Sequence, residues 1–443
     1  MIDRGPPTVA PPRRVVAALL FVATATVACS DDEPGQDLAG TRIEVVAVWQ
    51  DAEASAFGQV LDAFEAATGA TVVYSSTEGE DIAAVLDRRL AAGDPPDVAI
   101  LPQPGLLAAY AARGAIVPVD DIVGGAVRQR YALEWQRLGS VDGELYGVWF
   151  KAANKSLVWY SVGAFERAGV IPPGDLDRLG EVAAALTAAG TPAFSLPNDP
   201  SEAWTLTDLF ENLYLRLAGP SRYDALAAHR LAWTDPSVEA TLTVLASLVG
   251  SSQRASLPPD ADFPASVAAV FSTAPRAAMI VEGDFVPGVV AGTSDAELGV
   301  DVDVFAFPER SDRDPHVVGG GDAAVLMRSS EGGEALLRYL ASAEAGEVWA
   351  RLGGFISPNE AVDLAAYPDA RTRRIAGALL DAGGGGFRFD LSDLQPVAFG
   401  GTTGAGMWAV LHDLLLDPSD VRGAAARLEE AASAAWAPSE MRG

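Results

Sequence analysis

Cysteine and histidine are almost absent from this chain. It has one cysteine, Cys29, and three histidines among 443 residues. A lone cysteine forms no disulfide within the chain and cannot build a multi-thiolate metal site. The histidines, His229, His316 and His412, lie far apart in the sequence and lack the spacing of metal ligands. We therefore expect no disulfide framework, no metal site and no cofactor.

Positive charge is also scarce. The chain has 60 acidic and 31 basic residues, which gives a net charge of −29. Nucleic-acid binding needs a basic surface, and so does adsorption on anionic lipid headgroups, so we expect neither. Only two of the basic residues are lysines, Lys151 and Lys155, and they stand four residues apart. This pair indicates either chance placement in a loop or a ligand that needs a compact cationic donor.

Long apolar runs are missing after the N-terminal region, so no later segment is predicted to span a membrane. The run Val15–Ala28 follows Arg13 and Arg14, carries no charge and ends in a small residue, which is the layout of a secretory signal. With Cys29 next, it resembles a bacterial lipoprotein signal, and an ordinary signal peptide with an incidental cysteine is the alternative. We expect a signal peptide at residues 1–28 and a disordered tether at 29–40.

A β-α-β-α-β pattern opens the rest of the chain. Apolar runs predict strands at Ile43–Val48, Thr71–Tyr74 and Asp97–Leu101, and helical periodicity predicts helices at Ala54–Ala67 and Asp81–Ala91. Such alternation is typical of a parallel sheet covered by helices. Ligands of such sheets bind beyond the carboxyl ends of the strands.

The same reasoning predicts further elements along the chain. Helices are expected at Gly180–Ala189, Leu206–Leu217, Val238–Leu248 and Glu334–Arg351, and strands at Val148–Phe150, Ser156–Tyr160, Ala277–Val281, Asp301–Phe307 and Ala323–Met327.

Five motifs together resemble one family. They are Gln103–Leu107, Val141–Val148, the group Thr207, Asp208 and Glu211, Gly319–Asp322, and Gly353–Asn359. The chain is similar to family 1 of the extracellular solute-binding proteins of bacterial ABC importers, which are maltose-binding-like, and within it to the α-glucoside-binding branch. The resemblance implies an α/β periplasmic-binding-protein fold with two lobes, several crossings and a ligand cleft between the lobes. Carried over, the N-terminal lobe comprises residues 41–150 and 308–352, and the C-terminal lobe 151–307 and 353–443.

A sugar site needs carboxylates, amides, a cation and aromatic plates, because sugars offer hydroxyls for hydrogen bonds and C–H faces for stacking. Trp49 and Asp322 are the best supported from the sequence, since one follows a predicted strand and the other follows three glycines. The expected ligand-binding residues are Trp49, Asp51, Gln103, Lys151, Trp204, Asp208, Glu211, Glu282, Asp322, Phe355, Arg388 and Trp408.

The resemblance implies a monomeric binding protein without enzymatic activity. It would be anchored through Cys29 to the outer face of the cytoplasmic membrane and would deliver a sugar to the permease subunits of an importer. One alternative keeps the fold and changes the solute to a peptide or an osmolyte. Another is a secreted glycoside hydrolase that uses a carboxylate pair such as Asp208 and Glu282, which would have to lie roughly 5–10 Å apart.

Overall fold

The computed structural model describes residues 1–2, 5, 37–78, 80–250, 254–383 and 385–437. The described residues from 37 to 437 form one compact unit. The expected signal peptide, Cys29 and most of the expected tether lie outside the described residues. Among the helices that are described, none combines the length and apolarity needed to cross a bilayer.

The predicted β-α-β-α-β opening is confirmed. Strands β1 (Arg42–Ala47), β2 (Thr71–Ser76) and β3 (Val98–Leu101) alternate with helices α1 (Asp51–Thr68) and α2 (Ile82–Ala91). β1 lies between the other two and pairs with both in parallel, so that Val45 is level with Tyr74 on one side and Val98 on the other. Trp49 and Gln103 therefore leave the sheet at the same edge.

These strands belong to a larger sheet with the order β11-β10-β3-β1-β2, in which β6 also pairs with β10. Chain segments far apart in sequence meet here, because β6 (Gly147–Asn154), β10 (Val317–Leu326) and β11 (Phe387–Phe389) come from three regions. Other helices of this part are α3 (Pro104–Ala112), α4 (Asp120–Arg130), α5 (Leu133–Leu138), α13 (Glu331–Leu340), α14 (Ala343–Ala350) and α15 (Ala370–Asp381).

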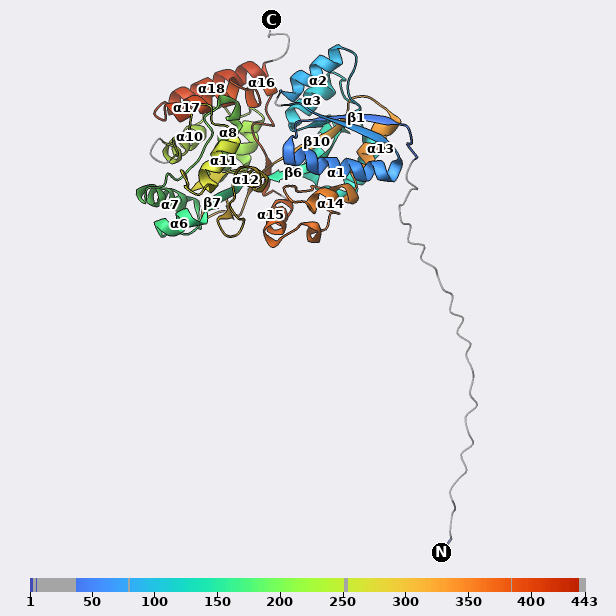
Figure 1. Cartoon of the computed structure of the whole chain (residues 1–443), viewed down its shortest axis with the longest axis horizontal. Helices are drawn as coiled ribbons and strands as arrows, with labels where there is room; N and C mark the ends of the chain where they lie inside the picture. The colour runs from blue at the N-terminus through green and yellow to red at the C-terminus, as the bar shows by residue number, and fades with distance from the viewer. Residues whose placement is uncertain (3–4, 6–36, 79, 251–253, 384, 438–443) are drawn as a thin grey trace. The chain divides into compact units, whose positions relative to one another are not determined.

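A second, smaller sheet has the order β8-β7-β9 and is antiparallel. Its strands are β7 (Leu157–Ser161), β8 (Met279–Val281) and β9 (Val302–Ala306). Figure 1 shows helices gathered around it, among them α7, α8, α10 and α11. The helices of this part are α6 (Val162–Ala168), α7 (Leu176–Ala188), α8 (Trp204–Ala218), α9 (Pro220–Ala227), α10 (Pro236–Leu248), α11 (Phe263–Phe271), α12 (Val286–Thr293), α16 (Val397–Gly400), α17 (Gly406–Leu416) and α18 (Val421–Trp436).

Two sheets, each with its own helices, give the expected two-lobed α/β architecture. The chain passes between them after β6, after β9 and after β11. The predicted lobe boundaries stay a prediction. The pairing of β11 with β10 places residues 387–389 in the larger sheet, although they fall in the range expected for the C-terminal lobe.

Three details differ from the sequence expectations. The predicted single helix Glu334–Arg351 is wrong, because the chain breaks after α13 and Ser342 caps α14 by accepting a hydrogen bond from Ala345 N at 3.2 Å. β10 begins at Val317, so the glycines before Asp322 lie within the strand. β6 extends to Asn154, which places Lys151 in a strand, not in a loop.

Helix α8 lies at the centre of the smaller lobe and is buried along nearly all of its length. Its apolar residues, including Leu209, Phe210 and Leu213, pack in the core of this lobe. Its polar residues Asp208, Glu211 and Asn212 are buried too, and they recur at the three- and four-residue spacing of one helix face. Buried polar groups need partners, so this face must meet other polar groups.

Candidate functional site

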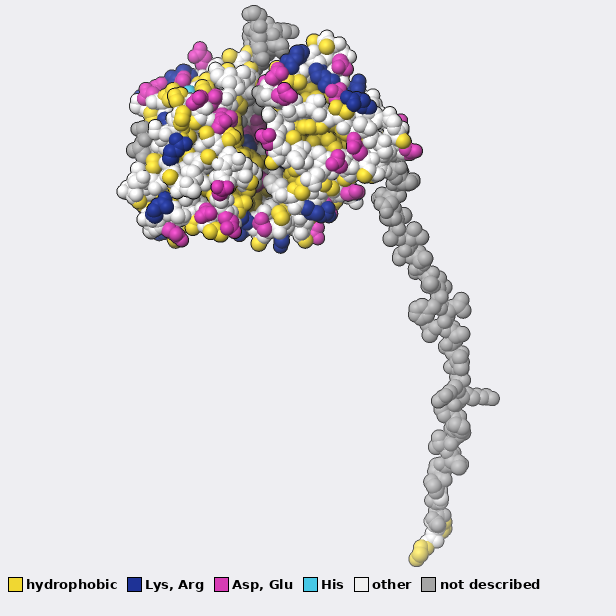
Figure 2. Space-filling model, in the orientation of Figure 1, with side chains coloured by type: hydrophobic (Ala, Val, Ile, Leu, Met, Phe, Trp, Pro, Cys, Tyr) yellow, Lys and Arg dark blue, Asp and Glu magenta, His cyan; other side chains and the backbone are white. Residues whose placement is uncertain are grey.

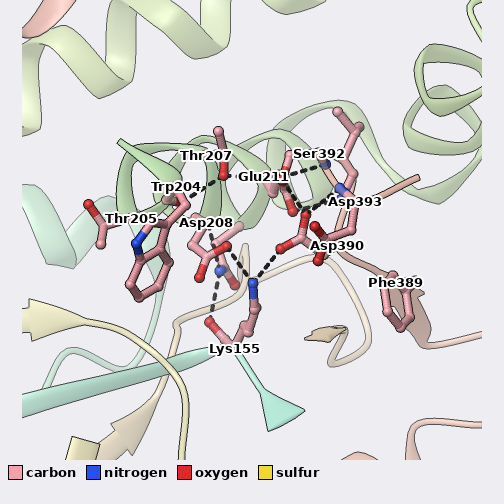
Figure 3. A network of polar contacts seen from close by, with 12 residues as sticks. Lys155, Trp204, Thr205, Thr207, Asp208, Glu211, Phe389, Asp390, Ser392 and Asp393 are labelled. Carbon is pink, nitrogen blue, oxygen red and sulfur yellow. Dashed lines mark hydrogen bonds and ion pairs between the residues drawn. The ribbon is translucent and has the colours of Figure 1, made fainter. Parts of the chain in front are cut away.

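Lys155 is the centre of a polar network against α8. Its Nζ donates to Asp208 Oδ1 at 3.0 Å and to Asp390 Oδ2 at 2.5 Å, as Figure 3 shows. Asp208 comes from α8 and Asp390 from the segment that follows β11. The Trp204 ring, one helical turn before Asp208, lies with its centroid 6.0 Å from the same Nζ. Three distant segments thus converge on one ammonium group.

Glu211 binds the backbone of the segment after β11. Its two carboxylate oxygens accept hydrogen bonds from Leu391 N at 2.8 Å and Ser392 N at 2.9 Å. The Tyr223 hydroxyl donates to the same carboxylate at 3.4 Å and to Phe389 O at 2.9 Å. Glu211 therefore fixes the path of the chain beside Asp390.

Glu282 adds a further carboxyl group to this network. It follows β8 and is 0% exposed, and the backbone of Gly283 is within hydrogen-bonding reach of its carboxyl group. Asp208 Oδ2 is buried and accepts no hydrogen bond of ordinary geometry from the described residues. The carboxyl groups of Glu282 and Asp208 are within hydrogen-bonding reach of each other. Such a bond requires a proton on one of them, because two carboxylates can only accept.

Burial and like charge shift the pKa values of these acids upward. Burial raises the pKa of Asp208 to about 8, although the Lys155 charge acts against it. Burial also raises the pKa of Glu282 well above its ordinary value, and the charge of Asp208 adds to the effect. Asp390 differs, since its contacts with Lys155 outweigh burial and lower its pKa. These shifts favour the protonated forms of Asp208 and Glu282 and the ionised form of Asp390.

Lys151 is the centre of a second group, on the larger sheet. Its Nζ forms an ion pair with Glu53 of α1 and lies 4.0 Å from Asp322 Oδ2, on the neighbouring strand β10. The ring centroids of Trp49 and Trp349 are 5.7 and 5.6 Å from it, at the distance of cation–π contacts. Burial raises the pKa of Asp322 to about 6, against the opposing charge of Lys151.

Strands β6 and β10 carry or flank the lysines of both groups. Lys155 follows the last residue of β6, four positions after Lys151. Its side chain packs against Gly320 of β10, where a Cβ atom would lie only 2.9 Å from Lys155 Cε. Parts of both groups reach solvent, since the side chains of Lys155 and Asp322 are 13% and 12% exposed. Figure 2 shows the molecule hollowed between the part that carries α8 and the part that carries β1.

Not all expected site residues join these groups. Phe355 is fully buried and stacks on Trp349 with centroids 5.1 Å apart, which is a core position. Arg388 forms an ion pair with Asp224 at 2.5 Å. Trp408 is half-buried on α17, and its Nε1 has no partner among the described residues.

Of the remaining three, Asp51 and Gln103 border the groups, and Trp49 belongs to the group of Lys151. Asp51 is exposed at the start of α1 and has a positive φ of 47°. Gln103 hydrogen-bonds to Asp393, whose pKa is raised by burial and by the Asp390 charge. Trp49 is 2% exposed, and its ring packs edge-on against Phe57 and Trp349, so only a small part of it is open to a ligand.

Four charged residues of the groups were not among the expected site residues: Glu53, Lys155, Asp390 and Asp393. The lysine pair was the visible signal for Lys155 in a chain that otherwise uses arginine. Asp390 and Asp393 follow a short strand three residues apart, which is a weaker signal. Nothing in the local sequence distinguishes Glu53 from an ordinary residue in the first turn of a helix.

Oxygens of Asp208, Glu211 and Asp390 lie within 4.8 Å of one another, a spacing that suits a cation. The Lys155 ammonium already bonds to two of these three carboxylates. The Lys155 ammonium therefore takes the place that a metal cation would have among these three carboxylates.

Comparison with known proteins yields a consistent set of similarities. The profile of the family described as bacterial extracellular solute-binding protein matches residues 49–347. The osmoprotective compounds-binding protein GgtB of Synechocystis sp. is 33% identical over 362 residues, covering 79% of this chain and 83% of that protein. The alpha-glucosides-binding periplasmic protein AglE of Rhizobium meliloti is 29% identical over 398 residues, covering 86% of this chain and 85% of that protein.

Solved structures share the fold at low sequence identity. The solute receptor AcbH, described with a preference for β-D-galactopyranose, matches with a TM-score of 0.75 at 16% identity, over 88% of this chain and 98% of its own. The GacH receptor of Streptomyces glaucescens, known with acarbose, matches with a TM-score of 0.68 at 16% identity, over 90% of this chain and 98% of its own. At these identities the structures establish the two-lobed fold alone.

Proposed function

Because the chain belongs to the bacterial extracellular solute-binding proteins, we propose that it captures a sugar between its lobes and delivers it to the permease subunits of an ABC importer. The family places the protein outside the cytoplasm. The observation that carries the proposal is the pair of lysine-centred groups, each combining an ammonium, carboxylates and a tryptophan. This set of side chains suits hydroxyl groups and C–H faces.

The ligand proposed is an α-glucoside or a related oligosaccharide. The name of the Rhizobium relative supports it, and closure of the lobes around the sugar would complete the site. An osmolyte is the second candidate, since the relative from Synechocystis is named for osmoprotective compounds. A peptide has no comparable support in these comparisons.

We propose no catalytic role for the carboxylates. The pair Asp208 and Glu282 is within hydrogen-bonding reach, whereas glycoside hydrolases hold their carboxyl groups roughly 5–10 Å apart. The family and the named relatives are binding proteins.

A thermal-shift panel tests the proposed function. We expect maltose, trehalose or sucrose to raise the melting temperature of the purified protein by several degrees, because a ligand that binds only the folded state stabilises it. Asp322→Asn should reduce this shift, while Glu166→Gln, a change on an exposed surface, should leave it intact. A shift with glycine betaine or a peptide and none with any sugar would overturn the sugar assignment.

Membrane anchoring through Cys29 and a monomeric state are part of the same proposal. The apolar run before Cys29 supports the anchor. A clickable fatty acid fed to the producing bacterium should label the protein, and Cys29→Ser should abolish the label. Labelling that survives this substitution would contradict the anchor.

A further inference from the structure

Helix α15 packs against β6 and β10 on the face opposite the two lysine-centred groups (Figure 1). On β10, Gly320 and Asp322 face the two lysines. Gly319 faces the other way, because successive residues of a strand alternate between the two faces of a sheet. A Cβ at Gly319 would lie 3.1 Å from Leu379 Cδ1 of α15. The β6–β10 pair therefore separates α15 from the groups proposed to bind the solute.

A direct ion pair joins α15 to the smaller lobe on this opposite face. Arg371, in the first turn of α15, has its Nε 3.4 Å from Oδ1 of Asp303 on β9. Gly299, before β9, has a φ of +89° and leaves room for the guanidinium, since a Cβ there would lie 2.8 Å from Arg371 Nη2. This contact is additional to the three chain connections between the sheets. It therefore links the lobes through two side chains that are free to separate.

The place of Asp303 on β9 makes this ion pair sensitive to a rotation of the lobes. Asp303 pairs with Tyr160, three residues beyond Leu157, the first residue of β7. It therefore lies roughly 10 Å from the connection between β6 and β7. Closure of the lobes over the lysine-centred groups moves them apart on the opposite face. Arg371 and Asp303 then have to separate.

Separation leaves Arg371 with another acid nearby. Asp369, which caps α15 by accepting a hydrogen bond from Thr372 N, also interacts with the Arg371 charge. Asp369 and Arg371 belong to the same helix, so their interaction is the same before and after closure. The free energy that depends on the angle between the lobes is therefore that of the Arg371–Asp303 pair.

We propose that the Arg371–Asp303 ion pair acts against closure and thereby lowers the affinity for the solute from the face opposite the site. The pair stabilises the arrangement described here and not the closed one, so the free energy of binding includes the cost of separating it. Arg371 and Asp303 are positioning residues that do not contact the solute. The inference rests on the proposed capture of a solute between the lobes, but not on which solute it is.

Titration calorimetry on the purified protein tests the inference, with maltose, trehalose and glycine betaine as the probes. We expect Arg371→Gln to bind its probe about two- to fivefold more tightly than the natural protein, which is the range of a partly exposed ion pair. Arg374→Gln removes the same charge from an exposed position of α15 and should leave the affinity unchanged. The side chains of Arg371 and Asp303 are 19% and 41% exposed, so both tolerate substitution, and melting curves without a probe check the fold.

Two further variants assign the effect to the pair. Asp303→Asn should tighten binding as Arg371→Gln does, and the double variant should bind no more tightly than either single one, because the second change finds no ion pair to remove. Arg371→Lys keeps a cation opposite Asp303 and should bind within about twofold of the natural protein. A merely structural role of Arg371 would weaken binding in every one of these variants.

The outcomes separate this inference from the proposed function. Affinity that is unchanged or weaker in Arg371→Gln, or tightening that adds up in the double variant, would overturn the inference and leave solute binding intact. Glycine betaine as the one probe that binds would overturn the sugar assignment, and the same variants would still test the ion pair. Binding of no probe would overturn the proposed function, and this inference with it.

Discussion

At the scale of the residue, Glu211 shows how a buried carboxylate holds a chain segment in place. Its two oxygens satisfy two consecutive backbone N–H groups, of Leu391 and Ser392, that no strand or helix would satisfy there. From the sequence, such a residue on a helix resembles any solvated glutamate. Its contacts place it beneath Asp390, which itself binds Lys155.

Replacing Glu211 with glutamine should therefore destabilise the protein by about 2–3 kcal/mol, because the new amide group would face a buried N–H and leave it without an acceptor. Urea denaturation measures the change. Glu166→Gln, on the exposed side of α6, is the matched control and should have almost no effect. Equal stability of the two variants would contradict the role given to Glu211.

The pH dependence of stability follows from the raised pKa values. Burial raises the pKa of Asp322 and of Asp284 to about 6, and that of Asp208 to about 8. A carboxyl group with a raised pKa stabilises the fold fully below its unfolded value, near 3.9, and loses that contribution as the pH rises through its folded value. The lowered pKa of Asp390 changes the stability of the fold only below about pH 4.

We therefore expect the melting temperature of the unliganded protein to fall by a few degrees between pH 5.5 and pH 8. Scanning calorimetry across this range measures it. Asp208→Asn should flatten the slope, because it removes one of the groups that must lose a proton. A melting temperature that rises with pH in this window would show that the buried acids are ionised in the folded protein.

At the scale of the element, the polar face of α8 contacts all three connections between the sheets. Asn212 Nδ2 donates to Lys155 O at 3.0 Å after β6, and Arg216 donates to His316 O at 2.7 Å before β10. Glu211 holds the segment after β11. Helix α8 therefore hydrogen-bonds to each of the three connections between the sheets, which explains why its polar residues are buried.

The β6–β10 pair depends on a close approach at Gly321. A Cβ at this position would lie 2.5 Å from Lys151 O, too close for the two strands to keep their spacing. Gly321→Ala should destabilise the protein by roughly 1–3 kcal/mol and weaken sugar binding, since Lys151 and Asp322 flank the contact. Chemical denaturation and calorimetry measure both effects.

Gly125→Ala is the control, because no atom lies within 4 Å of a Cβ there and the position is inside α4. It should leave binding unchanged and stabilise the protein by up to about 1 kcal/mol. If Gly321→Ala behaved in the same way, the tight contact between β6 and β10 would be refuted.

Most elements were predictable because their signals are local. Apolar periodicity and stop residues place the opening β-α-β-α-β pattern to within a few residues. The break at Ser342 was not predicted, because apolar spacing continues across it and only the cap marks the end of one helix. That Lys151 lies in a strand was also not predicted. It is in a strand because it pairs with Asp322 of β10, which is 171 positions further along the chain.

At the scale of the whole molecule, the candidate site is assembled from distant segments. Lys155 meets Asp390 across a separation of 235 residues, and no local pattern predicts such a contact. Four of the predicted site residues, Lys151, Asp208, Glu282 and Asp322, lie in the two groups; lysine usage pointed to the first, three glycines to the last, and mainly the family resemblance to the other two. It could not separate these from Phe355 or Arg388, because exposure and pairing depend on the folded chain.

The net charge of −29 is a property of the whole chain and should make its stability depend on salt. Figure 2 shows acidic side chains spread over the visible face of the molecule. Raising NaCl from 10 to 200 mM shortens the range of their repulsion from about 30 Å to under 10 Å, so the melting temperature should rise by a few degrees. Choline chloride should act equally well, and a response to one cation only would point to specific binding.

The two lysines have a practical consequence for labelling. Amine-directed reagents such as N-hydroxysuccinimide esters find only two ε-amino groups in this chain, and both are held in ion pairs, one beside Glu53 and one beside Asp390. Such a reagent can acylate a lysine only when its ion pair has separated. The acylation rate of Lys155, read by mass spectrometry, would thus report how often the centre of the molecule opens, and a bound solute should slow it.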